Sequence, residues 1–336
     1  MPTAYAKSAI LTHNCSMNRI LIIGCGDIAM RVAPLLQARY RLFGLARRTE
    51  HFAELRAAGI IPLRGNLDNP ASLARIVGLA DVVLHFAPPS STDKSPLRPP
   101  FSKWGTLGAR GMLRSPNLTR GARRGFEFAD HRTRNLLAAL SRGASPKRLI
   151  YISTSGVYGD CGGAPVNETH PLNPQTARAQ RRIDAEQQIR RWAKRNGVQA
   201  SILRVPGIYA ANRLPLDRLR TGTPAIAQAE DSYTNHIHAD DLARIVVAAL
   251  RNGKPNRVYH AADDSEMKMG EYFDVVADAY GLPRPPRLPR AEVEHSVSTG
   301  LWSFMNESRR LTNGRMKKEL KLRLRYPTMR DGLALK

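Results

Sequence analysis

A turn that contains two glycines near the start of the chain has the clearest chemical meaning. Four apolar residues, 20–23, precede Gly24, Gly26 and Ala29. They predict a short buried strand, and a helix is expected to follow over residues 27–39. Gly24 permits the tight turn, Gly26 leaves room for a pyrophosphate, and Ala29 lets the helix pack closely on the strand. The pattern predicts a dinucleotide site, because a helix N-terminus offers free N–H groups to phosphates; a plain strand–turn–helix corner is the alternative.

The expected second strand, residues 40–45, leads into Arg47 and Arg48 with no acidic residue before Glu50. Sites that prefer NAD commonly place Asp or Glu there, where the carboxylate binds the ribose hydroxyls. Two guanidinium groups suit a 2′-phosphate instead. The sequence therefore predicts NADP in preference to NAD, and ordinary surface charge is the alternative interpretation of the two arginines.

Expected strands and helices alternate through residue 206. The strands are expected at residues 20–23, 40–45, 60–63, 81–87, 148–152 and 199–204. The helices are expected at residues 27–39, 51–58, 70–77, 128–141 and 177–196. This alternation predicts an α/β fold with a doubly wound parallel sheet of the Rossmann type. We expect a loose N-terminal extension over residues 1–16 and a basic inserted loop over residues 90–128.

Composition narrows the classes of partner. The 52 Lys and Arg residues against 28 Asp and Glu give a net charge of +24, which suits an anionic partner. The excess is spread along the chain without a nucleic-acid-binding motif, so nucleic acid is the least favoured partner. No apolar run approaches the ~18 residues that a membrane span needs. Cys15, Cys25 and Cys161 lack metal or disulfide spacing, so we expect no metal, a cytoplasmic location, and a packing role for Cys25.

Several further motifs occur in a characteristic order. They are His85-Phe86-Ala87, Ser153-Thr154-Ser155-Gly156-Val157-Tyr158-Gly159, Glu168 with Pro171, Arg204-Val205-Pro206-Gly207-Ile208-Tyr209, and His236-Ile237-His238-Ala239-Asp240-Asp241. With the glycine turn, they resemble the extended short-chain dehydrogenase/reductase family in its NAD(P)-dependent epimerase/dehydratase branch. The resemblance implies cofactor binding by Gly24, Gly26, Asp27, Ile28, Ala29, Arg47, Arg48, Asn66, Leu67, Phe86, Ala87, Ser153, Arg182 and Pro206.

The resemblance breaks down at the catalytic positions. In that family a Ser/Thr, a Tyr and a Lys act together, and Thr154 stands at the Ser/Thr position. Arg178 and Arg182 stand where the family has its Tyr and Lys. Arginine stays protonated, so Arg178 cannot serve as a general base, whereas Arg182 could still donate hydrogen bonds to a nicotinamide ribose. The chain is similar in this respect to an atypical YeeZ-like subgroup. Tyr158 and His170 are the candidates to replace the tyrosine, although a structural role is favoured for Tyr158 and simple exposure for His170.

The resemblance also implies a domain organisation. Residues 17–206 would form the dinucleotide-binding domain, and residues 207–336 a smaller C-terminal substrate domain. Within the latter, residues 236–262 would return to the first domain, with Asp240 or Asp241 as the N-cap of a helix over residues 240–251. A further helix is expected over residues 273–280, and family members often form homodimers through two long helices.

Two hypotheses for function follow. The first is an oxidoreductase or epimerase that acts on a sugar or nucleotide-sugar-like substrate. The alternative is a catalytically inactive NADP-binding sensor or scaffold, which the two arginines favour. A nucleic-acid binder is the third and least supported hypothesis. The glycine turn is common to the first two hypotheses, so it does not distinguish them.

Overall fold

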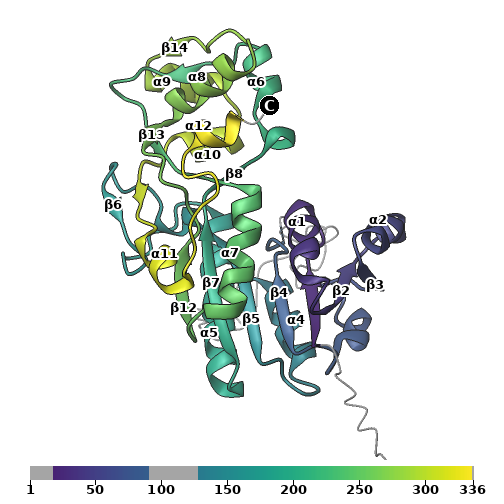
Figure 1. Cartoon of the computed structure of the whole chain (residues 1–336). Helices are drawn as coiled ribbons and strands as arrows, with labels where there is room; N and C mark the ends of the chain where they lie inside the picture. The colour runs from purple at the N-terminus through teal and green to yellow at the C-terminus, as the bar shows by residue number, and fades with distance from the viewer. Residues whose placement is uncertain (1–17, 91–127, 335–336) are drawn as a thin grey trace, which may run out of the picture.

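A seven-stranded parallel sheet forms the centre of the larger part of the molecule, and a smaller helical lobe lies beyond one end of it (Figure 1). These features come from a computed structural model that describes residues 18–90 and 128–334. The expected extension over residues 1–16, and all but the two end residues of the expected loop over residues 90–128, lie outside the described residues.

The strand order confirms the doubly wound Rossmann sheet. In space the order is β12-β7-β5-β4-β1-β2-β3, with every neighbouring pair parallel. The strands are β1 (Arg19–Ile23), β2 (Arg41–Ala46), β3 (Ile60–Arg64), β4 (Val82–His85), β5 (Arg148–Thr154), β7 (Gln199–Val205) and β12 (Arg257–His260). The order reverses between β1 and β4, and ligands of open α/β sheets bind outside the carboxyl ends of the strands at such a point.

Helices cover both faces of this sheet. On one face lie α1 (Asp27–Leu36) and α7 (Ala239–Asn252), and on the other lie α4 (His131–Leu140) and α5 (Ala177–Asn196). Successive residues of β1 point to opposite faces, so Ile20 and Ile22 pack with α1 and α7 while Leu21 and Ile23 pack with α4 and α5. Burial on both faces explains why the strand sequence is continuously apolar.

The smaller lobe has an apolar core of its own. Its elements are α6 (Leu216–Arg220), β9 (Ala225–Ile226), α8 (Met269–Ala279), β14 (Arg287–Leu288), α9 (Arg290–Ser296), α10 (Thr299–Met305) and α12 (Met329–Leu333). Leu219, Ile226, Phe273, Met305 and Met329 are buried together there. Between the two stretches that build this lobe, the chain runs back along the sheet as α7 and β12.

Short elements join the two parts and complete the loops. They are the helical turns η1 (Thr49–His51), η2 (Pro70–Ile76), η3 (Ser155–Tyr158) and η4 (Ala211–Arg213), the helices α2 (Phe52–Ala57) and α11 (Gly314–Leu320), and the strands β6 (Pro165–Val166), β8 (Gly207–Tyr209), β10 (Tyr233–Thr234), β11 (His236–His238), β13 (Met267–Lys268) and β15 (Arg310–Leu311). Strand β15 pairs with β6, and β11 pairs with β8. These pairings hold segments together that are far apart in the sequence.

Several expected elements differ in the structure; for example, the helix expected over residues 128–141 covers His131–Leu140. The first helix ends at Leu36 rather than at residue 39, and residues 70–76 form a 3₁₀ rather than an α-helix. Helix α8 begins at Met269, four residues before the expected start. Its start is fixed by the Glu271 carboxylate, which accepts the N–H of Lys268 at 2.9 Å. Element ends depend on such local caps more than on apolar periodicity.

The N-terminus of α7 is also capped differently from the prediction. His238 is the N-cap, and its Nδ1 accepts the N–H of Asp240 at 3.2 Å. Asp241 is buried and accepts the N–H groups of Arg325 and Tyr326 at 2.9 and 2.7 Å. The prediction of Asp240 or Asp241 as N-cap is therefore wrong, because a distant segment of chain uses the Asp241 carboxylate.

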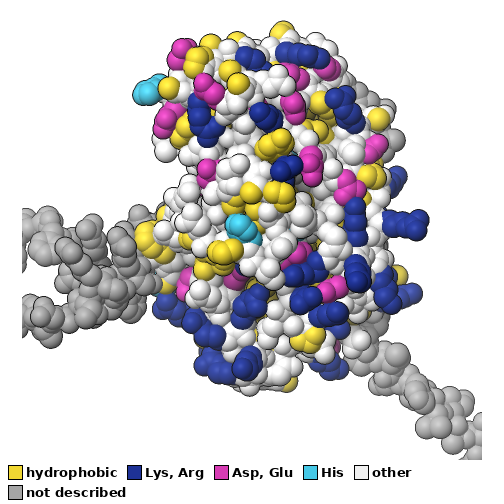
Figure 2. All heavy atoms as spheres, turned by 90° about the vertical axis from the view of Figure 1, so that its left-hand side faces the viewer, with side chains coloured by type: hydrophobic (Ala, Val, Ile, Leu, Met, Phe, Trp, Pro, Cys, Tyr) yellow, Lys and Arg dark blue, Asp and Glu magenta, His cyan; other side chains and the backbone are white. Residues whose placement is uncertain are grey.

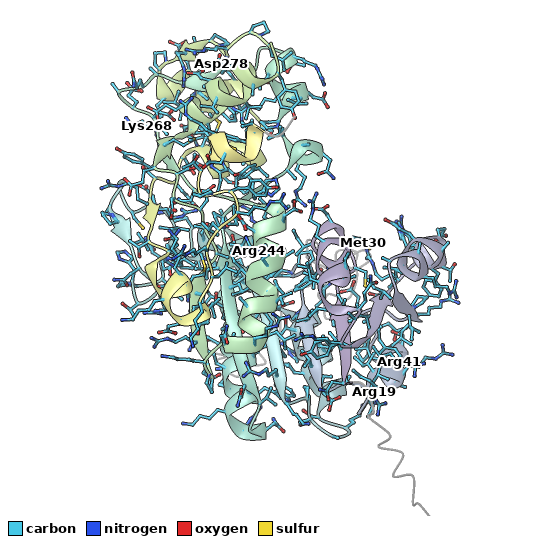
Figure 3. All side chains as sticks on the ribbon, in the orientation of Figure 1. Arg19, Met30, Arg41, Arg244, Lys268 and Asp278 are labelled. Carbon is cyan, nitrogen blue, oxygen red and sulfur yellow. The ribbon has the colours of Figure 1, made fainter. Side chains whose placement is uncertain are left out.

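The surface charge is distributed over both parts of the molecule. Figure 2 shows Lys and Arg side chains on the upper and lower halves of one face, with Asp and Glu interspersed. Arg19 and Arg41 pair in register at the amino ends of β1 and β2 (Figure 3). In the described part of the chain, no helix combines the length and the apolar character needed to cross a membrane, and no cluster of His, Cys, Asp and Glu is arranged to hold a metal.

Buried histidines give the stability of this fold a predictable pH dependence. Four are buried among the described residues, and burial lowers the pKa of each, including that of His238. Burial lowers the pKa of His85, His236 and His260 to about 3 each. They are therefore neutral when folded, whereas the unfolded chain protonates them below its pKa of ~6.5. Their contribution to stability is complete above that pH and is lost as the pH falls toward 3. Burial raises the pKa of Asp263 to about 7. The folded chain therefore holds a proton on this carboxyl group that the unfolded chain releases, and the net proton uptake on unfolding is smaller by one.

We expect the free energy of unfolding to fall between pH 6.5 and 4 with a net uptake of about two protons, or ~3 kcal/mol per pH unit at the steepest. Urea titrations across this range measure that slope. His236→Phe retains the ring that stacks on Tyr272, with centroids 4.1 Å apart, and should lower the slope by about one proton. His51→Ala, at an exposed side chain, is the control and should leave it unchanged. A slope unaffected by His236→Phe would contradict the assignment.

Candidate functional site

A pocket of about 570 Å³ opens at the carboxyl ends of β1, β2 and β4, where the strand order reverses. Eleven of the residues expected to bind cofactor line it: Gly24, Gly26, Asp27, Ile28, Arg47, Arg48, Asn66, Leu67, Phe86, Ala87 and Arg182. The fold therefore brings together residues that are spread over more than 150 positions of sequence.

The two glycines of the turn have different surroundings. Gly24 has a φ of +96°, and a Cβ there would lie 2.5 Å from the backbone nitrogen of Ala87. The end of β4 approaches this closely because the N–H groups of Phe86 and Ala87 both donate to the carbonyl of Ile23, at 2.7 and 2.9 Å. Around Gly26, by contrast, a Cβ would meet nothing within 4 Å. The backbone angle of Gly24 and its close packing against Ala87 thus require a glycine, whereas the space beside Gly26 is open to a ligand.

The first turn of α1 faces this open space. Gly26 is the N-cap and has no side chain to accept the N–H groups of the first turn. These donors and the positive end of the helix dipole suit a pyrophosphate. Asp27 is the acidic residue in the lining, and its two carboxylate oxygens accept from Arg31 at 3.0 Å and from Arg213 at 3.2 Å.

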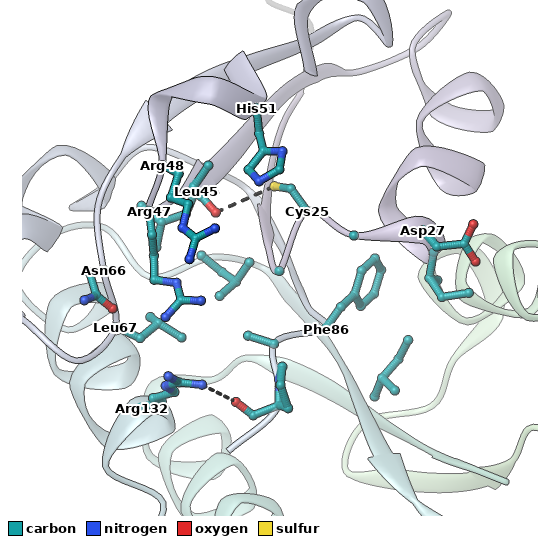
Figure 4. A pocket seen from close by; sticks show the side chains of 18 of the residues that line it. Cys25, Asp27, Leu45, Arg47, Arg48, His51, Asn66, Leu67, Phe86 and Arg132 are labelled. Carbon is teal, nitrogen blue, oxygen red and sulfur yellow. Dashed lines mark hydrogen bonds between the residues drawn. The ribbon is translucent and has the colours of Figure 1, made fainter. Parts of the chain in front are cut away.

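Arginines dominate the electrostatics of the pocket. Arg47 and Arg48 follow β2, and Figure 4 shows their guanidinium groups directed into the cavity. Neither forms a hydrogen bond or an ion pair within residues 18–90 and 128–334. Arg132, Arg182 and Arg213 also line the pocket. Arg132 and Arg213 are paired with Asp68 and Asp27, so Arg47, Arg48 and Arg182 leave the lining with an excess of positive charge that suits an anionic ligand.

Arg132 was not foreseen from the sequence. Its guanidinium forms two hydrogen bonds of 2.8 Å to the Asp68 carboxylate and donates to the carbonyl of Pro88 at 3.2 Å (Figure 4). The guanidinium lowers the pKa of Asp68. This contact ties the loop after β3 to the end of β4. Asp68 and Pro88 are 64 and 44 residues away, so no local pattern could reveal it.

Arg182 lines the pocket from α5. From the sequence, it was predicted to stand at the Lys position of the family that the chain resembles. Its Nη1 donates to the carbonyl of Ile152 at 2.7 Å and to the hydroxyl of Tyr151 at 3.0 Å. Its guanidinium also stacks over the Tyr151 ring, 5.5 Å from the centroid. The carboxyl end of β5 thus fixes the orientation of this cation.

Five of the expected site residues are not among the pocket-lining residues: Ala29, Ser153, Thr154, Arg178 and Pro206. Ala29 is buried in the core below the turn. Ser153 is buried and donates to the Glu186 carboxylate at 2.6 Å. The Thr154 hydroxyl accepts the N–H of Gly156 at 3.2 Å, as the N-cap of η3. Three of these side chains therefore have structural contacts.

The candidates to replace the family's tyrosine have different environments. Tyr158 is buried, and its hydroxyl contacts His260 Nε2 at 2.6 Å and accepts from Arg204 at 2.7 Å. Burial raises the pKa of Tyr158 to about 12, which disfavours proton transfer near neutral pH. His170 lies edge-on to Tyr158 and 4.0 Å from the Cys161 sulfur.

Further residues that were not expected to bind cofactor complete the lining, among them His51, Gly65, Pro88 and Ile208. Cys25, expected as a packing residue, also lines the pocket. The Cys25 thiol donates to the carbonyls of Ile22 and Leu45, both at 3.7 Å. Burial raises the pKa of this thiol to about 12. Cys25 is therefore an unreactive packing residue in the turn.

Comparison with known proteins agrees with this architecture. Residues 127–262 match the model of the NAD-dependent epimerase/dehydratase family. This segment runs from α4 to the end of β12, so it includes Thr154, Arg178 and Arg182 but not the glycine turn. A dTDP-glucose 4,6-dehydratase of Mycobacterium tuberculosis is 26% identical over 233 residues, which are 66% of this chain and 62% of that protein. The chain matches about half to three fifths of the length of such curated relatives.

Solved structures resemble the chain over nearly its full length. A functionally unknown conserved protein from Silicibacter pomeroyi is 27% identical, with a TM-score of 0.69 over 94% of this chain and 97% of that one. The DesIV dTDP-glucose 4,6-dehydratase of Streptomyces venezuelae, solved with NAD bound, is 20% identical, with a TM-score of 0.68 over 94% of each chain. The second likeness supports the fold alone.

Proposed function

We propose that this chain is an atypical extended short-chain dehydrogenase/reductase that binds NADP and acts on a sugar or nucleotide-sugar-like substrate as an oxidoreductase or epimerase. The observation that carries the proposal is the pocket itself. It opens at Gly26, where a Cβ would meet nothing within 4 Å, and it reaches the guanidinium groups of Arg47 and Arg48, which form no ion pair with the described residues. Residues 207–336, apart from the returning segment 236–262, would supply the substrate domain.

The lining fits the parts of NADP. The first turn of α1 would hold the pyrophosphate, and Arg47 and Arg48 would hold the 2′-phosphate. Arg182 would donate to the nicotinamide ribose from the end of β5. The match to the epimerase/dehydratase family over residues 127–262 includes Arg182, so it supports that part of the assignment.

When bound, NADP would supply a hydride acceptor or donor. Proton transfer then needs a group of the chain, and Arg178 and Arg182 remain protonated. Thr154 could hold a substrate oxygen. Among the described residues, however, its hydroxyl contacts the N–H of Gly156 and no ionisable side chain that could take or give a proton. A catalytically inactive NADP-binding sensor or scaffold, similar to YeeZ-like proteins, is therefore the second candidate.

We expect wild-type protein to bind NADPH at least ~10-fold more tightly than NADH, because the 2′-phosphate gains charge-assisted hydrogen bonds. The double variant Arg47→Ala/Arg48→Ala should weaken NADPH binding ~10–100-fold and leave NADH binding nearly unchanged. Calorimetric titration measures both. Arg39→Ala, at an exposed arginine outside the pocket, is the matched control. Equal affinities for both nucleotides in the wild type would contradict the preference for NADP.

Turnover distinguishes the two candidates. The nicotinamide absorbance of the NADP(H)-loaded protein follows net oxidation or reduction of dTDP-glucose, UDP-glucose and a panel of free sugars. Chromatography of the same mixtures follows epimerisation, which leaves the cofactor unchanged overall. Tight NADPH binding without turnover on any of them would favour the sensor. Failure to bind either nucleotide would overturn both candidates. A cytoplasmic homodimer is part of the same proposal, and the mass of the protein in solution tests the dimer.

A further inference from the structure

A cationic side chain, Arg178, stands next to the proposed cofactor site and forms no ion pair with the residues that the structure describes. Arg178 lies on the first turn of α5, and its guanidinium stacks over the ring of Phe304 in α10, 4.3 Å from the centroid. Within residues 18–90 and 128–334, this guanidinium forms no hydrogen bond and no ion pair. Its five N–H donors can therefore bind a ligand, and stacking on the Phe304 ring orients the plane in which they lie.

The nearest acidic side chain does not neutralise it. The Glu307 carboxylate is buried and accepts from Arg309 Nη1 at 2.7 Å. The same Arg309 nitrogen donates to the carbonyl of Gly159 at 2.7 Å, and the buried Nε of Arg309 has no partner in the described part of the chain. Arg178 and Arg309 against one glutamate leave an excess positive charge in this cluster.

Helix geometry places the cluster beside the pocket. Arg178 is four residues before Arg182, so the two side chains emerge from the same face of α5 one turn apart. Arg182 lines the pocket and is held at the end of β5. Phe304 is 53% exposed and comes from the smaller lobe. The guanidinium thus lies where the two parts of the molecule meet, next to the end of the pocket that Arg182 marks.

We propose that Arg178 binds an anionic group of the substrate, a carboxylate or a phosphate, and so selects acidic sugars over neutral ones. A planar guanidinium binds either group through two parallel hydrogen bonds. Stacking on Phe304 fixes that plane in advance and lowers the entropy cost of binding. The proposal rests on the proposed function in one respect, which is that the substrate lies against α5 beside the cofactor.

Calorimetric titration with matched probes tests this role. UDP-glucuronate and UDP-glucose differ in a single carboxylate, and glucose 6-phosphate and glucose differ in a single phosphate. We expect wild-type protein to bind the member with the additional anionic group on its sugar ~10-fold or more tightly in at least one pair. Arg178→Gln should abolish that preference, leave the affinity for the other member unchanged, and leave NADPH binding unchanged. Phe304→Ala should reduce the preference partially.

Controls keep the outcome interpretable. Arg191→Ala removes an exposed arginine from the same helix, away from the pocket, and should change no affinity. Each titration is run with and without NADPH, so that a failure to bind NADPH is distinguishable from a failure at Arg178. The proposal is overturned if wild-type protein does not prefer the member with the additional anionic group on its sugar in either pair. It is equally overturned if Arg178→Gln retains the preference or weakens both members alike.

Discussion

Gly26→Asp is expected to weaken NADPH binding at least ~100-fold while the protein remains as stable as the wild type. A Cβ at Gly26 meets nothing within 4 Å, and the residue has extended backbone angles that any side chain can adopt. Asp is moreover a favoured N-cap, so the new side chain should not disturb α1. Its carboxylate would instead occupy the space beside the helix N-terminus and repel a pyrophosphate. The loss corresponds to ~3 kcal/mol of binding free energy.

Gly24→Ala is the matched comparison, two residues away. Its Cβ would lie 2.5 Å from the Ala87 nitrogen, and its φ of +96° is strained for any L-residue with a side chain. We expect this variant to lose ~2–4 kcal/mol of stability. Thermal or urea unfolding together with NADPH titration separates the two effects. Unchanged NADPH affinity in a folded Gly26→Asp protein would show that the pocket does not hold the pyrophosphate at this turn.

Glu186→Ala should be strongly destabilising, with a loss of ~3–5 kcal/mol of unfolding free energy. Glu186 and Arg204 are both buried and joined by hydrogen bonds of 2.7 and 3.1 Å, and Ser153 donates to the same carboxylate. Removing the carboxylate leaves the Arg204 guanidinium charged in a site from which water is excluded. The hydroxyl of Tyr158 then remains its nearest acceptor, at 2.7 Å.

Urea unfolding near pH 7 measures this loss. Asp217→Ala removes the partner of Arg220 in a pair whose side chains are 97% and 56% exposed, and should change the unfolding midpoint within error. An Arg204→Met/Glu186→Leu double variant should recover much of the stability, because it removes both buried charges together. A loss as small as that of Asp217→Ala would mean that water reaches the Glu186–Arg204 pair.

Much of the lining of the pocket could be predicted from the sequence because its signals are local. The strand β1, the turn at Gly24 and Gly26, and the arginines after β2 are contiguous patterns with direct conformational meaning. The bounds of α5 were predicted correctly at both ends for the same reason. Thr176 caps the start by accepting the N–H of Ala179 at 3.1 Å, and Gly197 ends the helix with a φ of +66°.

Predictions failed where a side chain is used by a distant segment. The carboxylate of Asp241, expected as an N-cap, instead binds the backbone of residues 325 and 326. Arg132 was not predicted to line the pocket, because its orientation depends on hydrogen bonds to Asp68 and Pro88. Such contacts depend on how strands and helices pack, and apolar periodicity carries no information about them.

The sequence by itself determined the Rossmann sheet, the position of the glycine turn, and the absence of a Tyr and a Lys at positions 178 and 182. These follow from residue type and short-range spacing. Tertiary structure alone decided the surroundings of those residues. It set Arg182 against the end of β5 and stacked Arg178 on Phe304, which is 126 positions later in the sequence. The physical reason is that the orientation of a guanidinium group, and its availability to a ligand, depend on the charges, rings and acceptors that folding brings close to it.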